Sequence, residues 1–136
     1  MKKAILAILL ATLALTACKK EDPAAWIDNT RWQYDDRQPD YQGYPRIIYC
    51  HLTLRNGGGL SIGDRYNGPA TSWHTQYDYR VKTYKYEGGE QGTLTLEGTN
   101  GETIGTTATA SFTLNFDKTR MYLSTPKGTY TLTRNR

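Results

Sequence analysis

Two histidines and one cysteine in the body of the chain have the side chains best suited to acid–base, nucleophilic or metal chemistry near neutral pH. His51 follows Cys50 directly, but neighbouring residues on a strand point to opposite faces, so a Cys–His nucleophile pair is disfavoured. Cys50 shares its parity with Ile48 and Leu52 and is expected to be a small buried hydrophobe. No second His or Cys stands at metal-ligand spacing from His74, so we expect no metal and no cofactor.

The carboxylates offer no clear catalytic pair either. Asp35, Asp36 and Asp40 cluster in the segment DDRQPD, whose composition is typical of a loop. A paired-carboxylate hydrolase needs two acids held about 5–10 Å apart in a groove, and nothing in the spacing predicts that geometry. His-Glu-x-x-His, Cys-x-x-Cys and Gly-x-Ser-x-Gly motifs are all missing from the sequence. We therefore predict a non-catalytic protein and not an enzyme.

The first 17 residues have the pattern of an export signal. Lys2 and Lys3 precede an apolar run, Ala4–Leu15, that only Thr12 interrupts. At ~1.5 Å per residue this run spans about 18 Å, which is shorter than the ~30 Å hydrocarbon core of a bilayer. The run is therefore interpreted as the hydrophobic region of a signal peptide and not as a transmembrane helix.

The tetrad Leu15-Thr16-Ala17-Cys18 resembles the lipobox of bacterial lipoproteins. The resemblance implies cleavage before Cys18 and acylation of that cysteine, and two or more acyl chains give stable membrane anchoring. The alternative is an ordinary secretory peptide with an incidental cysteine. The next residues, Lys19-Lys20-Glu21-Asp22, resemble the signal that directs lipoproteins of Bacteroidota to the outer leaflet, although a short charged stretch is also typical of a solvated linker. We expect an outer-membrane, lipid-anchored protein, and the sequence favours surface exposure over a periplasm-facing orientation.

Cleavage would also change the charge balance. The full chain has 17 Lys and Arg against 13 Asp and Glu, a formal charge of +4, which suggests an anionic partner such as nucleic acid. Removal of Lys2 and Lys3 lowers this excess to +2. The remaining basic residues are dispersed, and their longest run is Lys19-Lys20. No basic stripe that could follow a phosphate backbone is visible, so nucleic-acid binding is not expected.

The rest of the chain alternates between apolar and polar residues with a period of two, which is typical of strands. Asn56–Gly59 predicts the turn of a hairpin, and the aromatic parity shifts between Val81 and Tyr84, which predicts a bulge near Thr83. Ala108–Phe116 gives the clearest strand, with Phe116 expected on the core face. Counting an opening strand over Arg31–Tyr34, we expect roughly eight strands at spacings of about ten residues.

Eight strands with one polar face each must form a two-sheet sandwich or close into a barrel. Short hairpin links favour an all-β, eight-stranded, antiparallel up-and-down barrel. The expected organisation is a signal peptide over residues 1–17, a lipidated linker over 18–28 and the barrel domain over 29–136. The interior of such a barrel is just wide enough for side chains or for one small ligand.

The mature chain resembles the small lipocalin-like lipoproteins of Bacteroidota, members of the calycin group of β-barrels. The resemblance lies in five segments: Asn29–Trp32, Tyr84–Tyr86, Gly92–Leu96, Ala110–Leu114 and Gly128–Thr133.

Calycins commonly place a first-strand Trp, preceded two residues earlier by Gly, against a basic residue of the last strand. Here the resemblance points to Trp32 and Arg134, with Thr30 in place of the Gly. We expect Arg134 to stack on Trp32 and close one end of the barrel, a cation–π contact of ~0.5–2 kcal/mol. The alternative places Arg134 in solvent at a frayed terminus.

Two functions remain open at this stage. In the first, the barrel binds a small apolar or amphipathic ligand, and the candidate ligand-binding residues are Trp73, Tyr77, Tyr79, Tyr84 and Tyr86. In the second, apolar side chains fill the barrel, and the aromatic segments Tyr34–Tyr49 and Tyr66–Tyr79 are exposed loops that bind a protein or glycan. Tyr and Trp suit the second role because they bury a large area at a low cost in conformational entropy.

Overall fold

The computed structural model describes residues 22–41, 44–67, 71–100 and 103–135. The predicted signal peptide and Cys18 lie outside these ranges. Among the described residues, no helix has the length and apolar character needed to cross a bilayer. The elements within these ranges are the 3-10 turn η1 (Ala25–Ile27) and the strands β1 (Thr30–Tyr41), β2 (Tyr44–Leu54), β3 (Gly59–Asn67), β4 (Thr71–Tyr86), β5 (Gln91–Gly98), β6 (Thr107–Leu114), β7 (Arg120–Thr125) and β8 (Gly128–Asn135).

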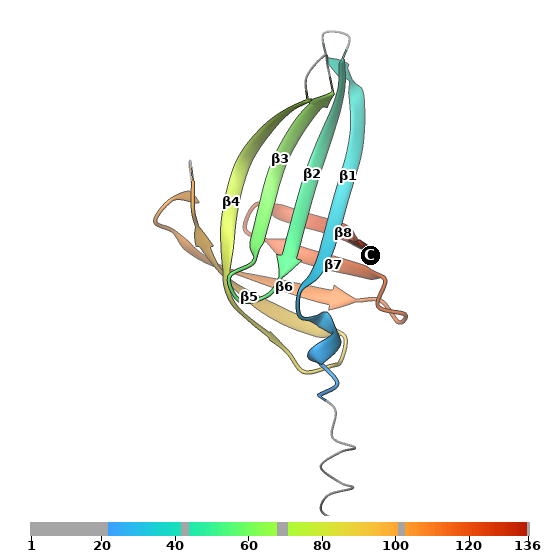
Figure 1. Ribbon diagram of the computed structural model, residues 1–136, viewed down its shortest axis with the longest axis vertical. Coiled ribbons are helices and arrows are strands. Elements are labelled where there is room, and N and C mark those ends of the chain that lie inside the picture. Colours follow the sequence, from blue (N-terminus) through green and yellow to red (C-terminus); the bar gives the residue numbers. More distant parts are fainter. Residues whose placement is uncertain (1–21, 42–43, 68–70, 101–102, 136) are drawn as a thin grey trace, which may run out of the picture.

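The strands form one closed antiparallel barrel in which each strand pairs with its neighbours in sequence and β8 returns to β1 (Figure 1). This arrangement confirms the predicted all-β, eight-stranded up-and-down barrel and is compatible with a lipocalin-like fold. The β2–β3 hairpin turns at the predicted glycine segment, where Gly57 adopts a φ of 82° that favours glycine. Closure of the sheet pairs the two edges that an open sheet would expose.

The four N-terminal strands are longer than the barrel needs. β8 pairs with β1 only over Arg31–Gln33, and β5 pairs with β4 only from Tyr79 onwards. The remaining parts of β1–β4 continue as a four-stranded sheet, here called the projecting sheet (residues 34–41, 44–50, 62–67 and 71–78). Figure 1 shows this sheet rising well beyond the shorter strands β5–β8, while η1 lies at the opposite end of the molecule.

Apolar side chains from all eight strands fill the barrel. The predicted alternation is observed in β5, where every second residue is buried. Several large side chains have essentially no accessible surface, among them Trp32, Leu52, Leu54, Leu60, Leu94, Leu96, Phe112, Met121, Leu123 and Leu132. A cavity wide enough for water would leave accessible area on the side chains around it. The interior of the barrel is therefore filled, which answers the question that the sequence left open.

The predicted change of parity in β4 is confirmed. The pairing of β4 with β5 shifts register between Val81 and Thr83, so Val81 and Tyr84 both turn towards the barrel side of the strand. A second irregularity lies between Ile62 and Gly63 in the pairing of β3 with β4. Bulges of this kind bend a strand and increase its twist. They allow β4 to serve both the barrel and the projecting sheet.

Three expectations from the sequence are wrong. Phe116 is 95% exposed, because β6 ends at Leu114 and the Asn115 side chain accepts hydrogen bonds from the backbone N–H groups of Thr119 and Arg120, which forms a turn. The aromatic segments expected to be loops belong largely to strands of the projecting sheet. Asp35 and Asp36 likewise lie in β1 and not in a loop. Apart from Tyr49, Cys50, Ile62, Gly63 and Asp64, the residues of this sheet whose burial is described are at least partly exposed. Its strands therefore lack the regular apolar alternation that identifies a half-buried strand.

Candidate functional site

The structure distributes the five candidate ligand-binding aromatics over separate places. Tyr79 is a buried side chain of the core. Tyr86 is also buried, and together with Tyr84 it lines a cleft at the closed end of the barrel, near η1. Tyr77 faces the open mouth, and Trp73 lies on the opposite face of the projecting sheet, where half of its surface is exposed. These residues therefore do not line one common cavity.

An aromatic and cationic cluster seals the closed end of the barrel. Trp32 and Arg134 are opposite one another in the β1–β8 pairing, as the resemblance implied. The Arg134 guanidinium lies over Trp26 of η1, 4.9 Å from its ring centroid, and the Lys118 ammonium lies 5.4 Å from the same ring. Trp26 in turn packs edge-on against Trp32 at 6.5 Å. Trp26 thus contacts both predicted partners, and a direct stack of Arg134 on Trp32 stays a prediction.

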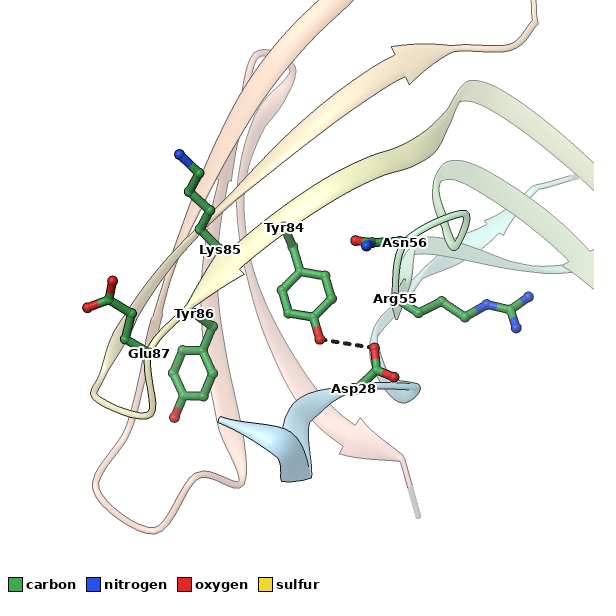
Figure 2. A pocket seen from close by; sticks show the side chains of 7 residues that line it. All are labelled: Asp28, Arg55, Asn56, Tyr84, Lys85, Tyr86 and Glu87. Carbon is green, nitrogen blue, oxygen red and sulfur yellow. Dashed lines mark hydrogen bonds between the residues drawn. The ribbon is translucent and has the colours of Figure 1, made fainter. Parts of the chain in front are cut away.

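The cleft drawn in Figure 2 also lies at the closed end and has a volume of about 660 Å³. Within it the Tyr84 hydroxyl donates a 3.0 Å hydrogen bond to Asp28, while Lys85 and Glu87 point away from this pair. Burial, the hydrogen bond and the Asp28 charge raise the pKa of Tyr84 to about 12. Tyr84 therefore stays neutral and ties the segment after η1 to β4, which is a structural role.

The barrel mouth offers a more open arrangement, here called the mouth cleft, with a volume of about 490 Å³. It lies between the inner face of the projecting sheet and the β7–β8 hairpin. The Lys127 ammonium of that hairpin lies 4.7 Å from the centre of the Tyr77 ring. Apolar, aromatic and charged groups line the cleft together: Arg46, Ile48, Ile62, Gly63, Asp64, His74, Gln76, Tyr77, Lys127 and Tyr130.

Asp64 is the centre of the polar network in the mouth cleft. Its carboxylate accepts hydrogen bonds from Arg46 Nε at 2.9 Å and from the Tyr66 hydroxyl at 3.2 Å, and it lies 3.2 Å from His74 Nδ1. Burial alone would raise the pKa of Asp64, but the hydrogen bonds and the positive charge of Arg46 outweigh burial and lower it. Asp64 is therefore an ionised hydrogen-bond acceptor that links Arg46 of β2, Tyr66 of β3 and His74 of β4, and it is not a proton donor.

The outer face of the projecting sheet carries an aromatic cluster, here called the outer cluster (Tyr49, His51, Arg65, Trp73 and Thr75). Gly63 leaves a gap on this face, and Tyr49 lies across it with its hydroxyl 2.6 Å from the Thr75 hydroxyl. Tyr49 is only 2% exposed because Trp73 packs edge-on against it at 5.1 Å. The Arg65 guanidinium covers Trp73 at 4.7 Å. The cluster therefore holds Trp73 in place while leaving half of it open to solvent.

The remaining candidates for chemistry have no catalytic surroundings. Cys50 is buried as predicted, and burial raises the pKa of its thiol to about 12. His51 lies on the opposite face, as predicted, with Nε2 3.0 Å from Asp35. Within the described ranges, no group of three His, Cys, Asp or Glu side chains could hold a metal ion.

Sequence reasoning missed the Asp64 network, Arg65 and Lys127. One signal was available: Asp64 continues the apolar parity of Leu60 and Ile62, which marks the point where β3 leaves the core. Two partners of Asp64, Arg46 and His74, lie on β2 and β4, and their proximity depends on a register with a bulge that the sequence does not specify.

The chain matches no protein-family model, no curated protein and no solved structure. The filled barrel, the projecting sheet and the two faces of that sheet are therefore the basis for assigning a function.

Proposed function

We propose that this protein is a lipid-anchored, non-catalytic binding protein whose filled barrel holds the projecting sheet out for a protein or glycan partner. One observation carries the proposal: the interior of the barrel is filled, while four of its strands continue well beyond the part that closes. Eight short strands would be enough to close the barrel and bury most of the core. We therefore attribute the additional length of β1–β4 to binding.

The filled interior favours a surface site over an internal one. Pockets for drug-sized ligands have volumes of ~300–1,000 Å³ and bury most of the ligand. Inside the barrel, Trp32 and Phe112 expose 1% and 2% of their surface, and Leu96 and Leu132 expose none. Displacing such side chains would expose apolar surface at about 25 cal/mol per Å². We therefore assign binding to the projecting sheet.

The placement of the predicted anchor supports the same assignment. Asp22, the first described residue, follows Cys18 by four positions, and four extended residues span at most ~14 Å. The chain enters the barrel through η1, at the end opposite to the projecting sheet (Figure 1). Acylation of Cys18 would hold the closed end near the membrane, so the projecting sheet would point away from it. This orientation suits a surface that meets partners outside the membrane.

The outer cluster supplies suitable chemistry. Trp73 is half exposed and held rigid by its neighbours, so little conformational entropy is lost when a partner covers it. Exposed aromatic residues beside arginine are typical of interface hot spots. Asp35 and His51, next to Tyr49, add hydrogen-bonding groups at the rim.

Photo-crosslinking on intact cells tests this proposal. A photoreactive phenylalanine analogue replaces Trp73 in one version of the anchored chain and Tyr122 in another. Tyr122 is the matched control because it is also an exposed aromatic, 44% accessible, but lies on β7 of the barrel. We expect an adduct with a protein or a glycan from position 73 and none from position 122. Equal adducts from both positions, or none from position 73, would contradict the proposal.

The mouth cleft favours a second candidate function, the binding of a small amphipathic ligand. Its volume of about 490 Å³ is within the usual range for ligand pockets, and Tyr77, Tyr130 and Lys127 combine apolar area with a cation. If the mouth cleft binds such a ligand, a small molecule should co-purify with the protein, and the Lys127→Gln variant should lose it. Exposed Lys82, on β4 of the barrel, provides the control variant Lys82→Gln, which should retain the molecule.

A further inference from the structure

The projecting sheet has two open edges among the described residues. On one side, β1 has no strand beside it beyond Gln33, where its pairing with β8 ends. On the other side, β4 has no strand beside it before Tyr79, where its pairing with β5 begins. An open edge presents unpaired backbone N–H and C=O groups and can template the addition of another strand. The two edges differ in how they are protected.

The edge formed by β1 carries the usual protective features. Three consecutive charged residues, Asp35, Asp36 and Arg37, follow the end of the β8 pairing, and Pro39 lacks a backbone N–H group. Charged residues and proline on an edge strand oppose pairing with another chain. This edge is therefore unsuited to strand addition.

Over Thr71–Tyr77 the edge formed by β4 has neither a charged residue nor proline, and its one irregularity there is the bulge opposite Ile62 and Gly63. The segment Thr71–Tyr77 contains no Lys, Arg, Asp, Glu, Pro or Gly, and every second residue is a threonine or an aromatic. Such residues have high β-propensity, and uncharged segments of six or seven of them are prone to pair with other strands. Charged residues on an edge strand normally prevent accidental pairing with another chain. The β1 edge has such residues and the segment Thr71–Tyr77 of β4 does not, which favours the β4 edge as the site of strand addition.

The backbone of β4 is oriented for such pairing. The His74 carbonyl lies against Gly63 of β3, where an added Cβ would meet it at 2.2 Å. Because backbone groups alternate between the two sides of an antiparallel strand, the neighbouring Trp73 turns its N–H and C=O groups to the open edge. Just below, the Asp78 carbonyl already accepts the backbone N–H of Thr99 at 3.0 Å. An incoming strand would continue this interaction along the edge.

We propose that the open edge of β4, Thr71–Tyr77, receives an extended, acidic peptide segment of a partner protein as an additional antiparallel strand. The proposal rests on the proposed function, and it specifies the kind of partner. Arg65 covers Trp73 on the outer face, and Lys127 covers Tyr77 on the inner face. Within the described part of the chain, neither cation forms an ion pair with a carboxylate. Successive side chains of the added strand point to opposite faces, so carboxylates on its outer face would reach Arg65 and carboxylates on its inner face would reach Lys127.

A second copy of the chain is a poorer occupant of this edge. Antiparallel pairing of two β4 strands around a two-fold axis would point the two projecting sheets in opposite directions. The segments that follow the predicted anchors would then lie at opposite ends of the dimer, because η1 lies at the end away from the projecting sheet (Figure 1). Two chains anchored in one membrane could not adopt this arrangement.

The test uses the whole chain, expressed with its own N-terminus and purified in mild detergent. Random 12-residue peptides displayed on phage are selected on the protein, and the tightest binder is synthesised. Hydrogen exchange measured by mass spectrometry then compares the protein with and without this peptide. We expect selected sequences rich in Asp and Glu, and protection gained over Thr71–Asp78 with no change in β6 and β7.

Charged substitutions on exposed side chains of the edge provide the critical variants. Ser72→Glu should weaken the peptide about tenfold, because a carboxylate on this edge repels an acidic strand. Thr95→Glu is the matched control, since Thr95 is exposed on β5, a strand paired on both sides, and it should leave the affinity unchanged. Lys127→Gln should weaken acidic peptides about threefold, as expected for loss of one exposed charge pair. Thermal unfolding of each variant checks that the barrel is intact.

Three results would overturn strand addition. The first is a library that yields no binder, or binders that protect another part of the protein. The second is a glycan that binds at Trp73 without protecting the β4 backbone, which would preserve the proposed function and reject the peptide. The third is concentration-dependent dimerisation that Ser72→Glu abolishes, which would identify a second copy as the occupant. Failure of the crosslinking at position 73 would instead reject the proposed function itself.

Discussion

At the residue scale, Cys50 shows how its surroundings suppress the reactivity of a side chain. The thiol is fully buried on the barrel side of β2, and burial raises its pKa to about 12. The thiolate, which is the reactive form, is therefore essentially absent at physiological pH. His51 lies on the other face of the strand and cannot act as its base.

We predict that Cys50 is inert in the folded protein. In the Cys18→Ser chain at pH 8, a chromogenic disulfide reagent should leave the native thiol unmodified and modify it rapidly in urea. The same chain carrying Cys50→Ala provides the background signal. Rapid modification under native conditions would show that the thiol is accessible and that β2 is not packed as described.

At the element scale, the projecting sheet depends on polar contacts in place of a deep core. Asp64 links β2, β3 and β4 through Arg46, Tyr66 and His74. Its pKa is lower in the folded protein than the ordinary value of 3.8. The stabilisation is therefore complete well above pH 3.8 and is lost as the pH falls through the lower folded-state pKa.

We predict that Asp64→Asn lowers the unfolding free energy at pH 7 by about 1 kcal/mol, a modest value because solvent screens the partly exposed Arg46. The acid-induced loss of stability below pH 4 should become shallower in this variant. Urea unfolding as a function of pH measures both effects. Glu97→Gln removes an exposed carboxylate from β5 and controls for the loss of a charge. An unchanged acid profile in Asp64→Asn would contradict the assigned network.

Gly63 gives an independent test of the same sheet. A Cβ at this position would meet the His74 carbonyl at 2.2 Å and the Tyr49 hydroxyl at 3.0 Å, so Gly63→Ala forces the backbone apart. We expect a loss of about 2 kcal/mol, as in other overpacked sites. Gly59→Ala on the same strand is the matched control, because its Cβ would meet only the Tyr79 carbonyl at an ordinary 3.7 Å. Equal unfolding free energies for the two variants would contradict the close packing of Tyr49 over Gly63.

The elements also show how far sequence reasoning reaches. Leu94, Leu96 and Phe112 lie where their alternation predicts, because one face of each of these strands is buried and the other is wet. The extension of β1 beyond the barrel escaped prediction because its side chains are largely exposed, so Asp35, Asp36 and their neighbours resemble a loop. The polar contacts of the projecting sheet were also hidden, since Arg46 and Asp64 meet through strand register across 18 positions of sequence. Phe116 was misplaced because the Asn115 turn ends the strand two residues earlier.

At the scale of the whole molecule, the predicted anchor and the proposed binding surface lie at opposite ends of the barrel (Figure 1). Between them the filled interior acts as a rigid spacer. Close-packed interiors resist deformation, so the barrel should keep the projecting sheet at a fixed distance from the closed end. At the closed end, Arg134 and Lys118 contact Trp26 and hold η1 in place.

We predict that Cys18→Ser releases the protein from membranes or leaves it unprocessed, since two or more acyl chains are needed for stable anchoring. Membrane fractionation, with the intact mass of the chain, measures this outcome. Cys50→Ser provides the matched cysteine control and should remain with the membranes. Unchanged fractionation of Cys18→Ser would contradict lipid anchoring while leaving the fold and the projecting sheet unaffected.

The central claim is that the barrel is filled and that binding belongs to the projecting sheet. Native mass spectrometry of the anchored protein, released gently from its own membranes, tests this claim most directly. The predicted result is the mass of the acylated chain alone or in complex with a macromolecular partner, and Trp73→Ala should lose that complex while Tyr122→Ala retains it. A stoichiometric small molecule that remains bound in the Trp73→Ala variant would contradict the claim.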